Sequence, residues 1–261
     1  MPYCNTNGIK LFYQESGQGE PVLFLHGLGS CGEDWQDQID AFSHDYRVIT
    51  VDTRGHGRSD KPLGPYNMPT YASDVINLLD HLGIKRCHLV GFSMGGMIAF
   101  QIAADAPERL NSLTIVNSAP AVPYNTLSEK LEFCLRIAVI RLFGMKLLAR
   151  IIGKRLFPEA RQKSLYQRFI TRMQGNPTTT YIEVIKSLIG WDVRPTLGNL
   201  EMPVLIISAD NDYTPVSYKT EYANKISTAN LVVINNSRHA TPIDQPQQLN
   251  KEVFQFLESL A

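Results

Sequence analysis

The chain has little cysteine and no excess of either charge. Only four of its 261 residues are cysteines, and Cys4, Cys31, Cys87 and Cys134 include no Cys-x-x-Cys pair. This spacing argues against a zinc site and favours reduced thiols in a cytoplasmic protein. Lys plus Arg and Asp plus Glu number 25 each, so the formal net charge is zero. We therefore expect neither nucleic acid nor an acidic polymer as a partner.

Long hydrophobic runs are absent as well. No uninterrupted apolar stretch reaches the ~20 residues that a membrane-spanning helix requires, so no stable membrane insertion is expected. Residues 1–8 show no basic patch followed by an apolar core, and no signal peptide is visible. With 44% hydrophobic residues, the chain can still bury a sizeable core. One large α/β domain is a better prediction than two small ones.

Short apolar runs at regular spacing predict a mostly parallel sheet. Asn7-Gly8 is a two-residue turn signal and predicts a hairpin near the N-terminus. Runs that are apolar on both faces follow at residues 22–25, 46–51, 87–90, 113–116, 204–208 and 231–234. Helical patterns lie between or after them, at residues 71–82, 97–104, 218–225 and 247–260. This alternation indicates an α/β fold in which helices cover both faces of the sheet.

The alternation stops between residues 121 and 197. Helical patterns punctuated by Gly and Pro replace it, which predicts a helical cap over the carboxyl edge of the sheet. We therefore divide the chain into a core, residues 1–120 and 198–261, and a cap, residues 121–197. Within the cap, residues 131–155 carry six basic residues and one acidic residue. A membrane-surface helix would gather such charges on one face. Because these charges scatter around the axis, we favour cap helices whose basic heads remain in water.

The segment Gly91–Gly96, with the sequence GFSMGG, lies between a predicted strand and a predicted helix. A serine at a sharp strand-to-helix turn needs small neighbours, because side chains two residues away would crowd the strained backbone. Gly91 and Gly95 meet this requirement, and the following helix points its positive end at the Ser93 hydroxyl. Ser93 is therefore the candidate nucleophile. A glycine-rich turn in which serine only caps a helix is the alternative.

A serine hydroxyl is a weak nucleophile until a base takes its proton, so Ser93 needs a histidine and an orienting acid. Among the six histidines, His239 follows the last predicted strand in a polar loop, at the edge where parallel strands form a reactive face. Asp210 and Asp212 both follow the preceding strand. We favour Asp212, which is farther from the strand end, because Asp210 can bond its own backbone in a turn. Residues 117–119, after an earlier strand, contain no carboxylate.

Two backbone N–H groups should stabilise the oxyanion that forms when the serine attacks. The N–H of Met94 follows the nucleophile, and the N–H of Leu28 lies in the glycine-rich loop His26–Gly29. That loop lacks the lysine followed by Ser or Thr that a phosphate-binding P-loop requires. Side chains near these loops should form the wall of the substrate pocket, namely Phe92, Trp35 and Met97.

Together these motifs resemble an α/β-hydrolase across nearly the whole chain. The matching segments are His26–Gly29, Asp52–Ser59 and Gly91–Gly96, followed by Asp212 and His239 in the family's order of Ser, Asp and His. The resemblance implies that Asp52–Ser59 shapes a turn and is structural. It also implies that the cap supplies the acyl or alcohol pocket, and that neither a metal nor an organic cofactor is needed.

The serine at this turn excludes the haloalkane dehalogenase and epoxide hydrolase branches, in which an aspartate takes its place. Within the serine branch, the chain resembles small carboxylesterases and 3-oxoadipate enol-lactonases. We predict hydrolysis of a small to medium carboxylic ester through an acyl-enzyme on Ser93. Enol-lactone hydrolysis is the alternative, and it requires a cap cation for the second carboxylate of the substrate. Arg168, Arg172 and Arg194 are available for that role.

Three further activities are less favoured. Ala240 and Phe92 depart from the residues usual in C–C bond hydrolases at these positions. A perhydrolase would share the same three catalytic groups. A small-molecule receptor on the hydrolase fold would need no turnover, but a full set of candidate catalytic groups favours catalysis.

Overall fold

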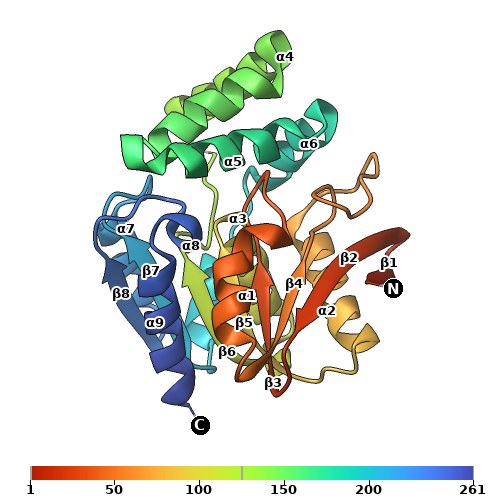
Figure 1. Ribbon diagram of the computed structural model, residues 1–261, viewed down its shortest axis with the longest axis vertical. Coiled ribbons are helices and arrows are strands. Elements are labelled where there is room, and N and C mark those ends of the chain that lie inside the picture. The colour runs from red at the N-terminus through yellow and green to blue at the C-terminus, as the bar shows by residue number, and fades with distance from the viewer. Residues whose placement is uncertain (1, 125, 261) are drawn as a thin grey trace.

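An eight-stranded sheet organises the molecule, in the strand order β1-β2-β4-β3-β5-β6-β7-β8 (Figure 1). The computed structural model describes residues 2–124 and 126–260. β1 (Tyr3–Thr6) and β2 (Ile9–Ser16) form the predicted hairpin, and β2 pairs antiparallel with β4. All later pairs are parallel, which confirms the predicted sheet. Its parallel strands are β3 (Glu20–Leu25), β4 (Tyr46–Val51), β5 (Cys87–Phe92), β6 (Leu110–Val116), β7 (Val204–Ala209) and β8 (Ala229–Ile234).

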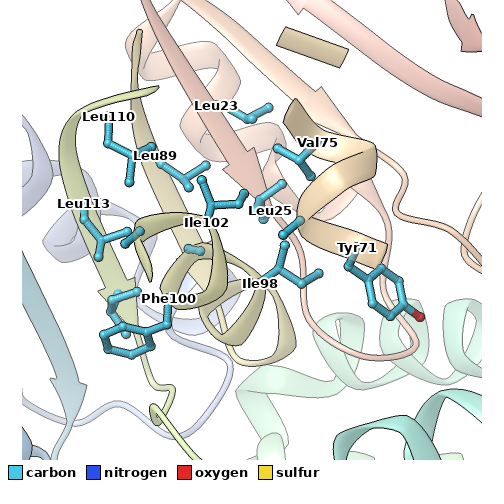
Figure 2. Close-up of a cluster of buried hydrophobic side chains, with 14 of the residues drawn as sticks. Leu23, Leu25, Tyr71, Val75, Leu89, Ile98, Phe100, Ile102, Leu110 and Leu113 are labelled. Carbon is cyan, nitrogen blue, oxygen red and sulfur yellow. The ribbon is translucent and has the colours of Figure 1, made fainter. Parts of the chain in front are cut away.

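Helices cover both faces of the sheet because its strands are apolar on both sides. Leu23 and Leu25 of β3 pack with α2 and α3 in one core cluster, part of which is shown in Figure 2. Val22 and Phe24 point to the opposite face and join the cluster that contains residues of α1 and α9. The helices that precede β6 or follow β7 are α1 (Gln36–Phe42), α2 (Met68–His81), α3 (Met94–Asp105), α7 (Val216–Ala223), α8 (Thr241–Asp244) and α9 (Pro246–Glu258). Short 3₁₀ turns span Gly32–Trp35, Pro107–Arg109, Ala160–Gln162 and Arg194–Asn199.

Three helices follow β6 and lie together over one edge of the sheet (Figure 1). They are α4 (Leu127–Leu156), α5 (Lys163–Gln174) and α6 (Thr178–Leu188), and they share a core cluster of their own. Leu28, just after β3, packs against that cluster and places these helices at the carboxyl edge of the strands. The two connections to this helical region run side by side, since Ala121 bridges Asp192.

Helix α4 is long but interrupted. Gly144 has φ 72° and ψ 178° within it, a backbone conformation that side chains disfavour. The outer surface of α4 leaves four leucines exposed, Leu127, Leu131, Leu135 and Leu142. Among the residues that the structure describes, no helix combines the length and apolar character needed to cross a membrane.

Candidate active site

The turn between β5 and α3 places Ser93 in a strained conformation. Ser93 has φ 52° and ψ −117°, and its N–H donates to the Val116 carbonyl at 3.0 Å. A Cβ on Gly91 would lie 2.4 Å from the Gly95 carbonyl oxygen, and one on Gly95 would lie 2.1 Å from the Leu25 carbonyl oxygen. The two glycines are therefore required by close backbone approach, as a serine on such a turn demands.

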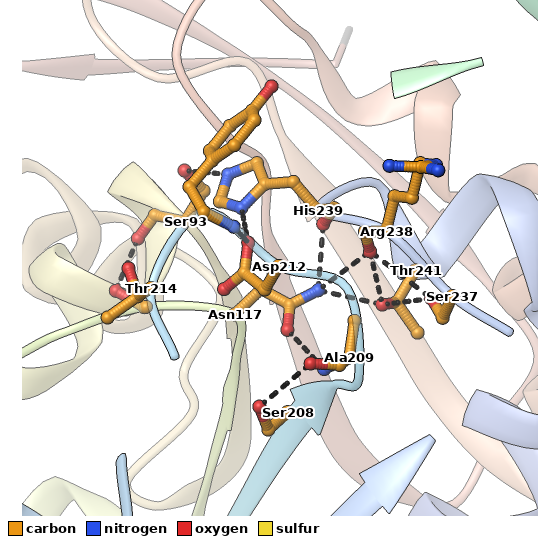
Figure 3. A network of polar contacts seen from close by, with 12 residues as sticks. Ser93, Asn117, Ser208, Ala209, Asp212, Thr214, Ser237, Arg238, His239 and Thr241 are labelled. Carbon is orange, nitrogen blue, oxygen red and sulfur yellow. Dashed lines mark hydrogen bonds and ion pairs between the residues drawn. The ribbon is translucent and has the colours of Figure 1, made fainter. Parts of the chain in front are cut away.

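Ser93, His239 and Asp212 form one hydrogen-bonded chain (Figure 3). His239 Nε2 lies 2.9 Å from Ser93 Oγ, and His239 Nδ1 lies 2.5 Å from Asp212 Oδ1. The Asp212 side chain is fully buried, whereas that of His239 is 16% exposed. Burial acts to raise the pKa of Asp212, but His239 and Lys219 outweigh it, and the pKa lies below its ordinary value. The buried acid is therefore a carboxylate facing the imidazole.

Asp210 has a different role in the structure. Its carboxylate accepts the N–H groups of Asn236 at 2.9 Å and Ser237 at 3.0 Å, so it holds the turn after β8. The structure brings Asp212 to His239, whereas Asp210 stabilises the backbone of the loop that leads to His239.

The loop after β3 lies against the serine. A Cβ on Gly27 would be 3.3 Å from Ser93 Cβ. The Thr53 N–H donates to Nε2 of the buried His26 at 3.0 Å, so the proton of this imidazole is on Nδ1, which donates to the Gly27 carbonyl at 2.8 Å. Burial lowers the pKa of His26 to about 4, which keeps the ring neutral. Because Gly27 C=O and Leu28 N–H belong to one planar peptide, His26 also fixes the direction of that N–H.

Met94 supplies the second candidate donor. It is the first residue of α3, and the first N–H groups of a helix have no acceptor within the helix. The Gly96 and Met97 N–H groups, in contrast, donate to the Ser93 carbonyl at 2.9 and 3.1 Å. The Met94 N–H thus stands beside Ser93 at the positive end of α3.

The predicted pocket residues separate into two groups. Phe92 is half-buried, with its ring centroid 5.2 Å from that of His239, and Met97 is partly exposed one turn into α3. Trp35 is only 1% exposed and packs 5.0 Å from the Phe24 ring in the core. The structure therefore places Trp35 behind Phe92 rather than at the pocket wall, because this large apolar ring fills the layer between β3 and α1.

Asn117 holds the His239 loop in place, a role the sequence analysis missed. Its φ is 45°, and its Oδ1 accepts the Ala209 N–H at 2.7 Å. Its Nδ2 donates to the His239 carbonyl at 2.8 Å and to Thr241 Oγ1 at 2.7 Å (Figure 3). One side chain thus joins the ends of β6 and β7 to the histidine loop. The signal in the sequence is an asparagine directly after a buried strand, whereas the prediction at that position concerned only a carboxylate.

Tyr213 lies against His239, and two arginines of α4 lie near Tyr213. The Tyr213 ring stacks on the imidazole with centroids 4.5 Å apart and planes at 25°. The Arg155 guanidinium lies 5.7 Å from the Tyr213 ring centroid. Arg136 is also close enough to act electrostatically on Tyr213, and its guanidinium donates to Tyr181 Oη at 2.7 Å. Arg136 Nε is buried and has no hydrogen-bond partner among the described residues.

The structure gives other surroundings to the three arginines that were available for a second carboxylate. Arg194 pairs with Asp192 at 2.6 Å, and Arg172 pairs with Glu33 at 2.9 Å. Arg168 and Arg172 line a cavity of about 550 Å³ between α5 and the loops of the sheet, and Ser93 and His239 are not part of its lining. Within residues 2–124 and 126–260, no three His, Cys, Asp or Glu side chains are grouped so that they could hold a metal ion.

The sheet, the strained turn at Ser93 and the histidine after the last strand, His239, together define a class of protein, the α/β-hydrolases. The family model described as the alpha/beta hydrolase fold matches residues 20–246, and the chain belongs to this family.

Comparison with individual proteins narrows this assignment. The 3-oxoadipate enol-lactonase 2 of Acinetobacter baylyi is 32% identical over 256 residues, which cover 94% of this chain and 92% of that protein. The crystal structure of the enol-lactonase from Burkholderia xenovorans LB400 has a TM-score of 0.91 at 27% identity, covering 98% of this chain and 100% of that one. A thermophilic esterase from Thermogutta terrifontis, with malate bound, has a TM-score of 0.89 at 25% identity, covering 99% and 97%. These similarities place the chain in the enol-lactonase-like branch and support a hydrolase.

Proposed function

We propose that this protein hydrolyses small to medium carboxylic esters through an acyl-enzyme on Ser93. The observation that carries the proposal is the hydrogen-bonded chain from Ser93 through His239 to the buried Asp212. A base within 2.9 Å of the hydroxyl can take its proton as the oxygen attacks. Asp212 holds the imidazole in the tautomer that accepts this proton and stabilises the imidazolium that results.

The reaction proceeds in two halves. In the first, Ser93 Oγ bonds to the ester carbonyl carbon, its proton passes to His239 Nε2, and the carbonyl oxygen becomes an oxyanion facing the N–H groups of Met94 and Leu28. The imidazolium then gives its proton to the departing alcohol oxygen as the C–O bond breaks. In the second half, His239 takes a proton from water, whose oxygen attacks the acyl carbon. Return of that proton to Ser93 releases the carboxylic acid.

Replacement of Ser93 tests the proposal directly. Ser93→Ala should lower kcat for p-nitrophenyl esters, screened from acetate to palmitate, by about 10³-fold or more, because the nucleophile is removed. A fluorophosphonate should label the native protein but not the variant, which separates an enzyme from a small-molecule receptor. Circular dichroism should show an unchanged fold. Retained turnover in Ser93→Ala would contradict the proposal.

The two aspartates of the β7 loop offer a matched pair for the same assay. Asp212→Asn should lower kcat strongly, since the amide favours the wrong imidazole tautomer. Asp210→Asn should act mainly on stability, because Asp210 accepts backbone N–H groups. The reverse order of effects on kcat would transfer the role of the acid to Asp210.

Hydrolysis of a lactone that carries a second carboxylate is the other candidate, and Arg136 favours it. This guanidinium lies in the helical region, acts on Tyr213 beside His239, and has a buried Nε without a partner among the described residues. Arginine binds carboxylates through paired N–H donors. Two similar proteins are enol-lactonases, and the similar esterase was crystallised with malate, a dicarboxylate. We assign residues 121–197 as the cap that would present Arg136 to such a substrate.

A further inference from the structure

A buried lysine contacts the acid of the proposed triad. The Lys219 side chain is fully buried, and its ammonium forms an ion pair with Asp212 Oδ2. Lys219 Nζ also donates to Ser208 Oγ and to the Thr214 carbonyl, each at 3.1 Å. These three acceptors satisfy all three donors of the ammonium. An interior charge is unfavourable unless it is paired and hydrogen-bonded, so this arrangement is a built feature of the site.

The two carboxylate oxygens of Asp212 contact different partners. Oδ1 faces His239 Nδ1 and accepts the Tyr213 N–H at 2.7 Å, whereas Oδ2 faces Lys219. The imidazole and the ammonium therefore contact different oxygens of one carboxylate. Lys219 lies on α7, seven positions after Asp212, and α7 packs on β7 and β8. This packing holds the positive charge in a fixed place beside the acid.

We propose that Lys219 is a positioning residue that offsets the charge of Asp212 and so limits how strongly His239 holds a proton. The inference rests on the proposed function of Ser93, His239 and Asp212. A lone buried carboxylate would favour the imidazolium, which cannot accept the serine proton. The neighbouring ammonium counters that effect. The ion pair also fixes the plane of the carboxylate that orients the imidazole.

Other charged and titratable groups surround the pair and are unchanged in the experiment. Tyr213 stacks on His239, and Arg155 and Arg136 of α4 act on Tyr213. Tyr222 of α7 lies close enough to Asp212 for the carboxylate to raise the pKa of its hydroxyl, after the larger effect of burial. A shift that the neutral Lys219 variants show and Lys219→Arg does not show therefore reports the loss of the positive charge.

The test is the acid limb of the kcat/KM profile against pH with one p-nitrophenyl ester. In Lys219→Met its midpoint should move up by about one pH unit or more, because the imidazolium loses a nearby repelling charge. Lys219→Arg retains the charge and should keep the midpoint close to that of the native enzyme. Lys225→Met removes an exposed ammonium that lies after α7 and pairs with Glu221 of that helix, and it should leave the profile unchanged.

The outcomes separate the inference from the function on which it rests. An unmoved acid limb in a folded, active Lys219→Met enzyme would overturn the role of Lys219 alone, as would an equal shift in Lys219→Arg. Should Lys219→Met fail to fold, Lys219→Gln removes the charge and keeps an amide for Ser208 and Thr214, and the same shift is expected. If both neutral variants unfold while Lys219→Arg is active, the lysine serves stability and the inference fails. Retained activity in Ser93→Ala would instead remove the proposed function.

Discussion

Arg136 differs from Arg172 and Arg194 in the partner of its guanidinium. Arg172 and Arg194 are neutralised by carboxylates, whereas the hydrogen bond that the structure gives Arg136 is to the uncharged Tyr181 hydroxyl. Burial raises the pKa of Tyr181, and the nearby Arg136 acts in the opposite direction. A guanidinium held by a phenol retains donors for an incoming carboxylate.

Replacement of Arg136 should therefore weaken the binding of substrates that carry a second carboxylate more than the binding of neutral substrates. Arg136→Gln is expected to raise KM for an ester or lactone with a second carboxylate by about 10- to 100-fold, the range of one hydrogen bond to a charged group. KM for a neutral ester of similar size should change little. Arg141→Gln, which removes an exposed arginine of the same helix, is the control. An equal loss with both substrates would mean that Arg136 only supports Tyr181.

At the residue scale, the sequence offers candidate catalytic groups that lie directly or shortly after strands of the α/β pattern. Ser93 follows β5, and Asp212 and His239 follow β7 and β8, so each could be found from a strand end. Asn117 also follows a strand, β6, but its role depends on contacts with a distant loop that a strand pattern does not describe. Lys219 lies within α7 and follows no strand end. The Asn117 contact to His239, for example, joins residues 122 positions apart.

At the scale of elements, the approach of α3 to β3 is the tightest constraint on the site. Gly95 in the first turn of α3 lies against the carbonyl oxygens of Leu25 and His26, where an added Cβ would be 2.1 and 2.7 Å away. Backbone atoms cannot move aside as a flexible side chain would. Any side chain at this position must push α3 and Ser93 away from the loop that carries Leu28.

Gly95→Ala should consequently lower both stability and activity. We expect a loss of about 1–3 kcal/mol in the free energy of unfolding, the usual range for overpacking, measured by urea denaturation. kcat should fall together with stability, because the helix carries the Met94 N–H. Gly175→Ala is the matched control, since the nearest atom to its added Cβ is 3.4 Å away and its φ is −70°. Equal stability of the two variants would show that the α3 contact is not the constraint.

Elements with regular apolar patterns were predicted more completely than those shaped by tertiary contacts. The predicted strand at residues 46–51 coincides with β4, and the predicted helix at 247–260 nearly coincides with α9. The glycines that punctuate the helical patterns of residues 121–197 were part of the prediction, and α4 is interrupted at one of them, Gly144. The sequence does not give the relative placement of the two segments, because the cluster that α4 shares with α5 and α6 decides it. Trp35 was misplaced for a similar reason, as nothing local distinguishes a core tryptophan from one at a pocket.

On the scale of the whole molecule, two buried histidines connect the loops that carry the site to the central sheet. His26 follows β3 and His56 lies in the turn after β4, with ring centroids 5.1 Å apart. Thr53 Oγ1 lies 3.2 Å from a nitrogen of each ring. Burial lowers the pKa of His26 to about 4 and that of His56 to about 3. The folded protein therefore keeps both rings neutral, because burial makes protonation of either ring unfavourable.

This pair should make the fold sensitive to mild acid. Histidine in the unfolded chain titrates near pH 6.5, so below that pH the unfolded chain binds protons that the folded chain does not bind. The free energy of unfolding therefore falls as pH drops from about 6.5 toward 4. By pH 5 the loss should be about 2 kcal/mol for each histidine, measured by urea unfolding at pH 7.5 and pH 5. Asp212 and Asp210, whose pKa values are lowered, lose their contributions only below about pH 4, outside this window.

Substitution of one ring isolates its share of the acid response. The amide of His26→Gln can accept the Thr53 N–H without taking up a proton, so the stability lost between pH 7.5 and pH 5 should shrink by about 2 kcal/mol. His81→Gln, at the exposed end of α2, should leave that loss unchanged. Because His26 also directs the Leu28 N–H, kcat should fall in His26→Gln even at pH 7.5, where both proteins are folded. If the variant lost as much stability between pH 7.5 and pH 5 as the native protein, protonation of other groups would cause the loss. His26 would then not couple the stability of the sheet to the site.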